Sequence, residues 1–260
     1  MCDALIGTGF IGSLLRTQRA FETVCDSQNI GRMDNCRFGT VYCAAPSGLK
    51  WKANANPEED NDAVIGLIYH LRQIEAECFV LISTVDVFGT PCGVNEETIP
   101  VPMGAYGNNR RHLEMFVEHL FKRSLVVRLP GIVGAGAKKG PLFDLRYGNE
   151  IEKLSRESTH QWYPGDRLLS DCEALLARGI SLAHLTTPPV SIGELCEKFC
   201  EKFLEKLGGV AAVKYDVQTV YGNCKYAGPT PWDDIEEYLL PQFYSDRKLC
   251  RMQQIGREKK

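Results

Sequence analysis

Three spaced glycines near the N-terminus constrain the fold of this chain more than any other feature of its sequence. A short apolar run ends at Ile6 and leads directly into the glycine turn, which comprises Gly7, Thr8, Gly9, Phe10, Ile11 and Gly12. Where a buried strand turns at once into a helix, such glycines permit a tight bend, the approach of a pyrophosphate to the backbone, and close packing of helix on strand. Glycines also mark ordinary turns, so the pattern alone predicts either a dinucleotide site over residues 7–12 or a simple turn.

Length and composition narrow the class of protein. The chain has 260 residues, which is enough for a nucleotide-binding domain and a smaller second lobe. Its formal net charge of -3 at pH 7 argues against a nucleic-acid partner, because general nucleic-acid binding needs a concentrated basic surface. The 11 cysteines are odd in number and include no C-x-x-C pair, so we expect reduced thiols and no bound metal.

The start of the chain and its apolar runs bear on localisation. Residues 1–5 carry no positively charged leader, and no apolar run approaches the ~20 residues that span a bilayer. We therefore expect a cytoplasmic protein with no membrane partner.

Two predicted strands end in residues that suit a ligand site. The near-continuous apolar run 78–82 is typical of a central parallel strand that is covered on both faces. It ends at Ser83 and Thr84, and hydroxyls at the carboxyl end of such a strand lie where open α/β sheets bind ligands. A strand at 40–43 is followed by three small residues, Ala44, Ala45 and Pro46. These leave space for a ligand, or simply pack beneath a turn.

Asp26 follows the plausible second strand, 21–25, and has two interpretations. A carboxylate at that strand end accepts hydrogen bonds from an adenosine ribose in dinucleotide-binding folds. Asp26 lies only fourteen residues after Gly12, whereas the usual spacing is ~20, and aspartate also forms turns. The sequence leaves both interpretations open.

A helix is predicted after residue 104. Apolar residues recur on one face of it, at Leu113, Phe116, Val117, Leu120 and Phe121. Tyr106 and Arg110 are four residues apart, so they share a helix face. The next buried strand, 125–129, is followed by Pro130.

Together these segments resemble the extended short-chain dehydrogenase/reductase family, in its NAD-dependent epimerase/dehydratase branch, over most of the chain. The glycine turn is similar to the family's own. Residues 83–89 (STVDVFG) resemble its S-S-x-x-V-Y-G strand end, Tyr106 stands where its Y-x-x-x-K motif begins, and residues 128–134 (RLPGIVG) resemble the next strand and loop.

The resemblance implies a fold and a division of the chain. We expect an α/β protein with a Rossmann-type, doubly wound parallel sheet and a small C-terminal substrate-binding lobe. Residues 1–134 would form the dinucleotide-binding core and residues 135–260 most of the lobe, with about 160–185 returning to the core. A homodimer that pairs the helix after Tyr106 and its neighbour at 60–75 would resemble the family's four-helix dimer.

The resemblance also implies an activity. NAD or NADP would bind across the glycine turn, and Tyr106 would act as general acid/base in hydride transfer, with Thr84 in the position of the catalytic hydroxyl. The substrate would be a nucleotide sugar or a related small carbonyl or alcohol. The implied cofactor-binding residues are Gly7, Thr8, Gly9, Phe10, Ile11, Gly12, Asp26, Ala44, Ala45, Pro46, Ser83, Arg110 and Pro130.

Arg110 is the main departure from the family pattern, because it replaces the lysine of Y-x-x-x-K. Arginine keeps the charge, but its planar fork does not reproduce the contacts of a compact ammonium group. We expect the Arg110 guanidinium to point toward the cofactor ribose and to lower the pKa of Tyr106. The alternative is a catalytically impaired, NAD(P)-binding redox sensor or scaffold protein.

Overall fold

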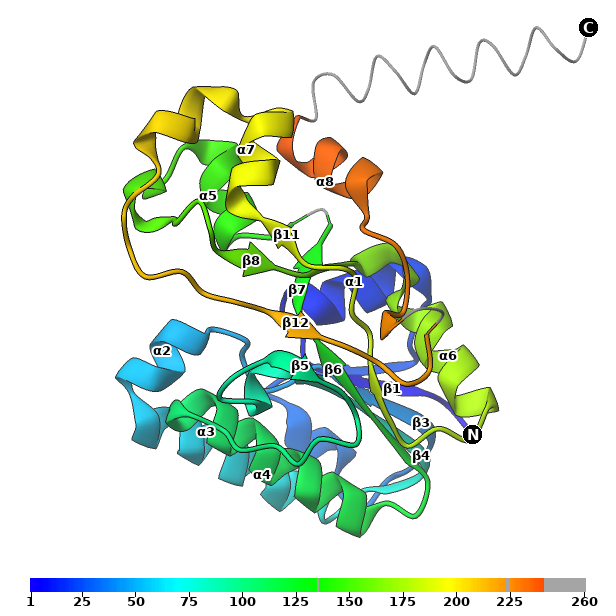
Figure 1. The fold of residues 1–260 in the computed structure, drawn as a ribbon. Helices are drawn as coiled ribbons and strands as arrows, with labels where there is room; N and C mark the ends of the chain where they lie inside the picture. The colour runs from blue at the N-terminus through cyan, green and yellow to red at the C-terminus, as the bar shows by residue number, and fades with distance from the viewer. Residues whose placement is uncertain (135, 223–224, 241–260) are drawn as a thin grey trace, which may run out of the picture.

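A computed structural model of the chain describes residues 1–134, 136–222 and 225–240 (Figure 1). Its centre is a six-stranded parallel sheet in the order β10-β6-β4-β3-β1-β2. The strands of this sheet are β1 (Ala4–Ile6), β2 (Thr23–Cys25), β3 (Arg37–Cys43), β4 (Glu75–Thr84), β6 (Ser124–Leu129) and β10 (Leu182–His184). The predicted Rossmann-type fold class is confirmed.

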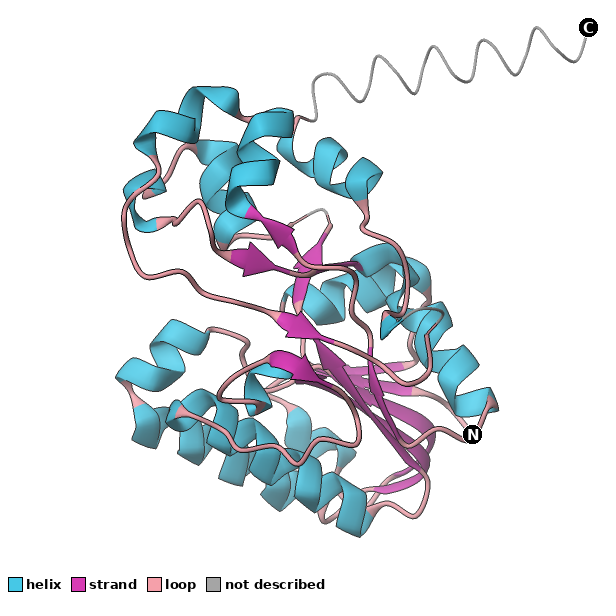
Figure 2. Cartoon of the chain, viewed as in Figure 1, coloured by secondary structure: helices cyan, strands magenta, loops and turns pink. Residues whose placement is uncertain are grey.

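Helices cover both faces of the sheet (Figure 2). Helices α3 (Pro57–Leu71) and α4 (Gly104–Leu120) pack on one face, and α1 (Phe10–Gln18) and α6 (Leu168–Ala177) pack on the other. The central run of β4, residues 78–82, is apolar because both of its faces are covered: Phe79 and Leu81 belong to the core beneath α3 and α4, whereas Val80 belongs to the core beneath α1 and α6. Alternate side chains of a strand point to opposite faces, so a doubly covered strand needs both sets apolar.

Strand β1 lies at the point where the direction of winding changes. Its neighbours are β2 on one side and β3 on the other, so the connections that leave β1 and β3 diverge at the carboxyl edge of the sheet. Open α/β sheets bind ligands at such a switch point. The glycine turn follows β1 directly, and α1 begins within it, at Phe10.

A smaller lobe lies beyond the carboxyl edge of the sheet (Figure 1). Its apolar core includes Trp162, Ile192, Leu195 and Ile235. Its elements are β7 (Gly131–Val133), α5 (Pro141–Tyr147), β8 (Thr159–His160), β9 (Trp162–Pro164), β11 (Val190–Ser191), α7 (Ile192–Phe199) and α8 (Trp232–Leu239). Strand β7 pairs with β9, and β11 pairs with β8. Residues 241–260 of the predicted lobe lie outside the described residues.

Shorter elements complete the chain. Strand β12 (Asp216–Val217) pairs with β5 (Cys92–Val94), which joins the segment after the lobe to the loop after β4. Helix α2 (Lys50–Ala55) precedes α3. Short 3-10 helices occupy Ile30–Met33, Val85–Val87, Ile151–Lys153, Gly165–Arg167 and Glu201–Lys206. Within the described ranges, no helix has the length and apolar character needed to cross a membrane.

Candidate functional site

The glycine turn has a backbone that requires its first and last glycines. Gly7 adopts φ +106°, and a Cβ there would lie 2.8 Å from the carbonyl oxygen of Ala44. A Cβ on Gly12 would lie 1.9 Å from the Gly7 carbonyl oxygen, so α1 packs on the turn only with glycine at both positions. Ala44 is held in place because its N–H donates to the Ile6 carbonyl at 2.7 Å.

Gly9 differs from the other two glycines because its surroundings are open. No atom of the described residues lies within 4 Å of the position that a Cβ on Gly9 would occupy. Gly9 also caps the N-terminus of α1, and the first turn of that helix contains no acidic residue. Helix N-termini attract anions through their free amides and dipole, so this open position suits a phosphate group. Phe10 and Ile11 follow in the first turn of α1, where Ile11 packs against the core.

Asp26 lies beside the glycine turn and also shapes its own turn. Its Oδ2 is 3.3 Å from the Thr8 hydroxyl, which donates to it. Its Oδ1 accepts a hydrogen bond from the Gln28 N–H at 3.0 Å, which closes the turn after β2. The structure thus contains the features of both interpretations: a turn former, and a carboxylate at the edge of the expected adenosine site.

Ser83 belongs to a buried polar network. Its hydroxyl donates to Glu114 Oε1 at 2.5 Å. The same carboxylate accepts bonds from Arg128 Nε at 3.0 Å and Nη2 at 2.7 Å, and both charged side chains are at most 1% exposed. Contact of Ser83 with a cofactor stays a prediction, since its hydroxyl proton is committed to Glu114. Contact with a cofactor also stays a prediction for Pro130, which lies between β6 and β7, and for Ala45 and Pro46 after β3.

Thr84 and Tyr106 are brought together from separate elements. Thr84 is the last residue of β4, and Tyr106 lies in the first turn of α4. The Thr84 hydroxyl donates to Asp86 Oδ2 at 3.5 Å, and it also lies close enough to the Tyr106 phenol to lower the pKa of that group. Gly107 makes this approach possible, because a Cβ there would lie 2.4 Å from the carbonyl oxygen of Asp86. The hydroxyl pair that the sequence predicted therefore exists at the carboxyl edge of the sheet.

The Arg110 guanidinium does not have the predicted orientation. It forms a bidentate ion pair with Asp60 of α3, at 3.0 and 2.9 Å, and donates to the Ser47 carbonyl at 2.7 Å. Its planar fork matches a carboxylate, and Asp60 stands in the first turn of the neighbouring helix. Burial favours a higher pKa for Asp60, but hydrogen bonds from Arg110 and Asn109 hold that pKa below its usual value. Arg110 instead lies over the Tyr106 ring, 4.5 Å from its centroid.

The charge of Arg110 acts on Tyr106 in the predicted direction, because it lowers the pKa of the phenol, but burial outweighs it. Burial raises the pKa of Tyr106 above its ordinary value, and the charge of Arg110 and the nearby Thr84 hydroxyl do not offset this. The ring is 7% exposed, and desolvation disfavours the charged phenolate. At neutral pH the tyrosine is therefore protonated.

Sequence reasoning missed a second cluster beside this pair. Lys50 Nζ lies 2.7 Å from Asp86 Oδ1 and 3.2 Å from the Tyr215 hydroxyl, which donates to the same Asp86 oxygen at 2.7 Å. Burial and the charge of Asp86 raise the pKa of Tyr215 to about 12. Asp86 could have been predicted as a site residue, because it lies only two residues after Thr84 at the end of β4. No local pattern marks Lys50 or Tyr215, which come from α2 and the segment before β12.

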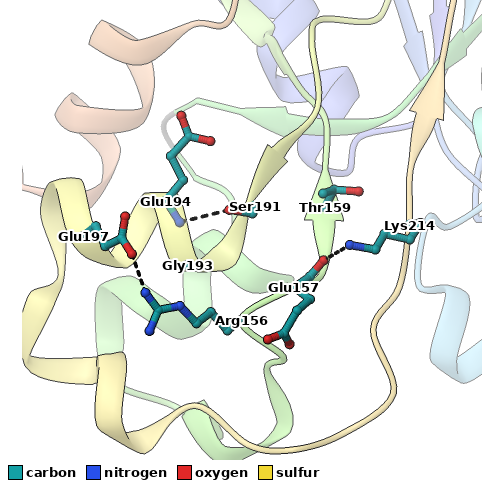
Figure 3. Close-up of a pocket in the computed structure, with 8 residues that line it drawn as sticks. All are labelled: Arg156, Glu157, Thr159, Ser191, Gly193, Glu194, Glu197 and Lys214. Carbon is teal, nitrogen blue, oxygen red and sulfur yellow. Dashed lines mark hydrogen bonds and ion pairs between the residues drawn. The ribbon is translucent and has the colours of Figure 1, made fainter.

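A shallow hollow of about 370 Å³ lies on the smaller lobe at the start of α7 (Figure 3). Its lining contains none of the predicted site residues, and much of its polar surface is already paired. Arg156 pairs with Glu197 at 2.5 Å, and the Ser191 hydroxyl accepts the Glu194 N–H at 3.0 Å. We therefore assign it no part in the site.

Comparison with known proteins supports the fold. No protein-family model and no curated protein matches the chain. Among solved structures, it is similar to a UDP-glucose 4-epimerase of Thermotoga maritima with UDP-glucose (TM-score 0.68, 14% identity, 95% of this chain and 99% of that one). It is also similar to WbmG of Bordetella bronchiseptica with NAD and UDP (0.72, 13%, 94% of each chain) and to MoeE5 with UDP-glucuronic acid and NAD (0.70, 17%, 95% and 100%). The fold that the sequence resemblance predicts is therefore confirmed.

Proposed function

We propose that this protein is an NAD(P)-dependent epimerase, dehydratase or reductase that acts on a nucleotide sugar or a related small carbonyl or alcohol. The observation that carries the proposal is the Thr84–Tyr106 hydroxyl pair, set at the same edge of the sheet as the open glycine turn. The solved structures named above contain NAD or uridine nucleotides, which supports the cofactor and substrate class.

The residues present fit a dinucleotide. The open space at Gly9 and the N-terminus of α1 suit the pyrophosphate, and the Asp26 carboxylate beside Thr8 suits ribose hydroxyls. A nicotinamide held by these residues would supply the hydride acceptor for an alcohol carbon or the hydride donor for a carbonyl carbon.

Tyr106 would exchange a proton with the substrate oxygen, and Thr84 would hydrogen-bond to it. In the reducing direction, protonated Tyr106 gives its proton to the carbonyl oxygen as that oxygen becomes a hydroxyl. In the oxidising direction, the phenolate takes that proton back. Thr84 donates a hydrogen bond to the same oxygen and fixes its position. The raised pKa of Tyr106 favours the proton-donor role at neutral pH, since a general acid must hold its proton until the transition state.

A homodimer through α3 and α4 belongs to the same proposal. Ile65 and Tyr69 of α3 are 50% and 63% exposed, and Met115 of α4 is 55% exposed. Apolar side chains on the outer surfaces of two adjacent helices favour association with a second copy.

The second candidate function is a cofactor-binding redox sensor without turnover. One observation favours it: the charge of Arg110 is paired with Asp60, which leaves Tyr106 without the free cation that the family places there. This candidate has the same cofactor site as the first but catalyses no hydride transfer.

Replacing Tyr106 with phenylalanine separates the two candidates. We expect Tyr106→Phe to bind NADH as the wild type does but to slow hydride transfer by about 10² to 10⁴, measured as nicotinamide absorbance with UDP-glucose and UDP-glucuronic acid as trial substrates. Tyr147→Phe, at a 60% exposed position on α5, is the matched control. If the wild type binds NADH and no turnover occurs with any nucleotide sugar, the sensor replaces the enzyme. Equal turnover in Tyr106→Phe would remove Tyr106 from the mechanism.

A further inference from the structure

The two cations nearest Tyr106 on its own side of the sheet are already paired with carboxylates. Arg110 is in a bidentate pair with Asp60, and both side chains are at most 10% exposed. Lys50 is paired with Asp86 at 2.7 Å. Arg110 and Lys50 each act to lower the pKa of Tyr106, but their carboxylate partners offset part of each charge, and together the two cations do not outweigh burial of the phenol.

Lys139 approaches the same place from the smaller lobe. It lies in the loop between β7 and α5, and its ammonium group donates to the Gly48 carbonyl. Among the described residues, no carboxylate oxygen lies within the 4.0 Å of its Nζ that defines an ion pair. Lys139 therefore brings a net positive charge to this part of the site.

Gly48 lies between Lys139 and Tyr106. A Cβ built on Gly48 would lie 3.5 Å from Lys139 Nζ and 3.9 Å from the Tyr106 hydroxyl oxygen. Both polar groups thus face one point in space, and residue 48 has no side chain to separate them. Desolvation of the ammonium and the charge of Arg110 lower the pKa of Lys139, and the charge of Asp86 opposes them, which agrees with a position next to both ion pairs.

The loop that carries Lys139 also reaches the glycine turn. A Cβ on Gly136, in the same loop, would lie 3.8 Å from the Phe10 ring at the start of α1. Residues 136–139 of the smaller lobe therefore lie near both Phe10 at the start of α1 and Gly48 beside Tyr106.

We propose that Lys139 is a positioning residue for Tyr106: its ammonium group, acting across Gly48, supplies the unpaired positive charge that stabilises the Tyr106 phenolate. The charge that the Y-x-x-x-K lysine would supply within α4 then comes from the smaller lobe. This role rests on the proposed function, in which Tyr106 exchanges a proton with substrate. The other groups that face the Tyr106 hydroxyl are Thr84, Asp86, Lys50 and Arg110.

The test measures the phenol of residue 106 directly. A fluorinated tyrosine, whose phenol titrates near neutrality while lysine is still charged, is incorporated at position 106, and phenolate absorbance is followed against pH without cofactor. We expect Lys139→Met to reduce the phenolate population about tenfold at a given pH, which corresponds to a pKa about one unit higher. Lys139→Arg, which keeps the charge, should leave the titration near that of wild type.

Lys138→Met is the matched control, because Lys138 is exposed like Lys139 and precedes it on the same loop. An unchanged midpoint in Lys139→Met, or an equal shift in Lys138→Met, would overturn the role of Lys139. A parallel titration of the wild type with NADH separates this outcome from failure of the proposed function: absent NADH binding defeats the proposed function, whereas the midpoints report on Lys139 alone.

Discussion

The glycine turn offers a test in which one glycine is needed for the fold and another only for the ligand. In Gly9→Ala, the new methyl group meets no described atom within 4 Å, and φ at this position is -70°. The reduced freedom of the unfolded chain stabilises the variant, and the poorer N-cap destabilises it, so we expect its free energy of unfolding to stay within about 1 kcal/mol of wild type.

Gly12→Ala, by contrast, should lower the free energy of unfolding. Its methyl group would lie 1.9 Å from the Gly7 carbonyl oxygen, and relieving such overlap requires backbone movement that costs about 1–3 kcal/mol or more. Urea denaturation measures the free energy of unfolding of both variants.

Measurements of dinucleotide binding should separate a loss of affinity from a loss of stability. In Gly9→Ala the methyl group occupies space that the pyrophosphate needs, so we expect the affinity for NADH and NADPH to fall at least tenfold, about 1.4 kcal/mol, in a protein that is still folded. Calorimetric titration measures the affinity. A folded Gly9→Ala variant that binds either dinucleotide as tightly as wild type would refute the placement of the pyrophosphate over Gly9.

Two further predictions concern the buried network. Glu114→Gln should lower the free energy of unfolding by about 3–5 kcal/mol, because it leaves the 1%-exposed Arg128 without its carboxylate. The control Glu118→Gln, at a partly exposed position, should change the free energy of unfolding by less than about 1 kcal/mol. Equal losses for the two variants in urea denaturation would contradict this prediction. His184 belongs to the same network, because its Nε2 lies 3.3 Å from Arg128 Nη1. Burial lowers the pKa of His184 in the folded state. Below a pH of ~6.5, the unfolded chain therefore binds a proton at this residue that the folded chain does not. Stability should therefore fall as the pH falls from about 7 to about 5, and His184→Gln should flatten this dependence in thermal melts; an unchanged slope would exclude His184 as its source.

The parts of the fold that sequence predicted well are those with local causes. The glycine spacing placed the strand-turn-helix at residues 4–18, and the continuous apolar run of β4 predicted a strand covered on both faces. Thr84 was recognisable because it ends that strand, and Tyr106 because it begins the next amphipathic helix.

The parts that sequence could not supply depend on contacts between distant residues. Arg110 and Asp60 are 50 positions apart, and no local pattern shows that their helices bring them together. Tyr215 meets Asp86 across 129 positions, through the pairing of β12 with β5. The raised pKa of Tyr106 follows from burial, which the spacing of one helix does not report.

Native mass spectrometry of the wild-type protein, with and without added NAD(H) and NADP(H), tests the central claim most directly. The glycine turn and the Thr84–Tyr106 pair predict one dinucleotide per chain, retained in Tyr106→Phe and lost in Gly9→Ala. A spectrum that contains only the bare chain, even with both dinucleotides in excess, would contradict the claim that this fold binds a nicotinamide cofactor.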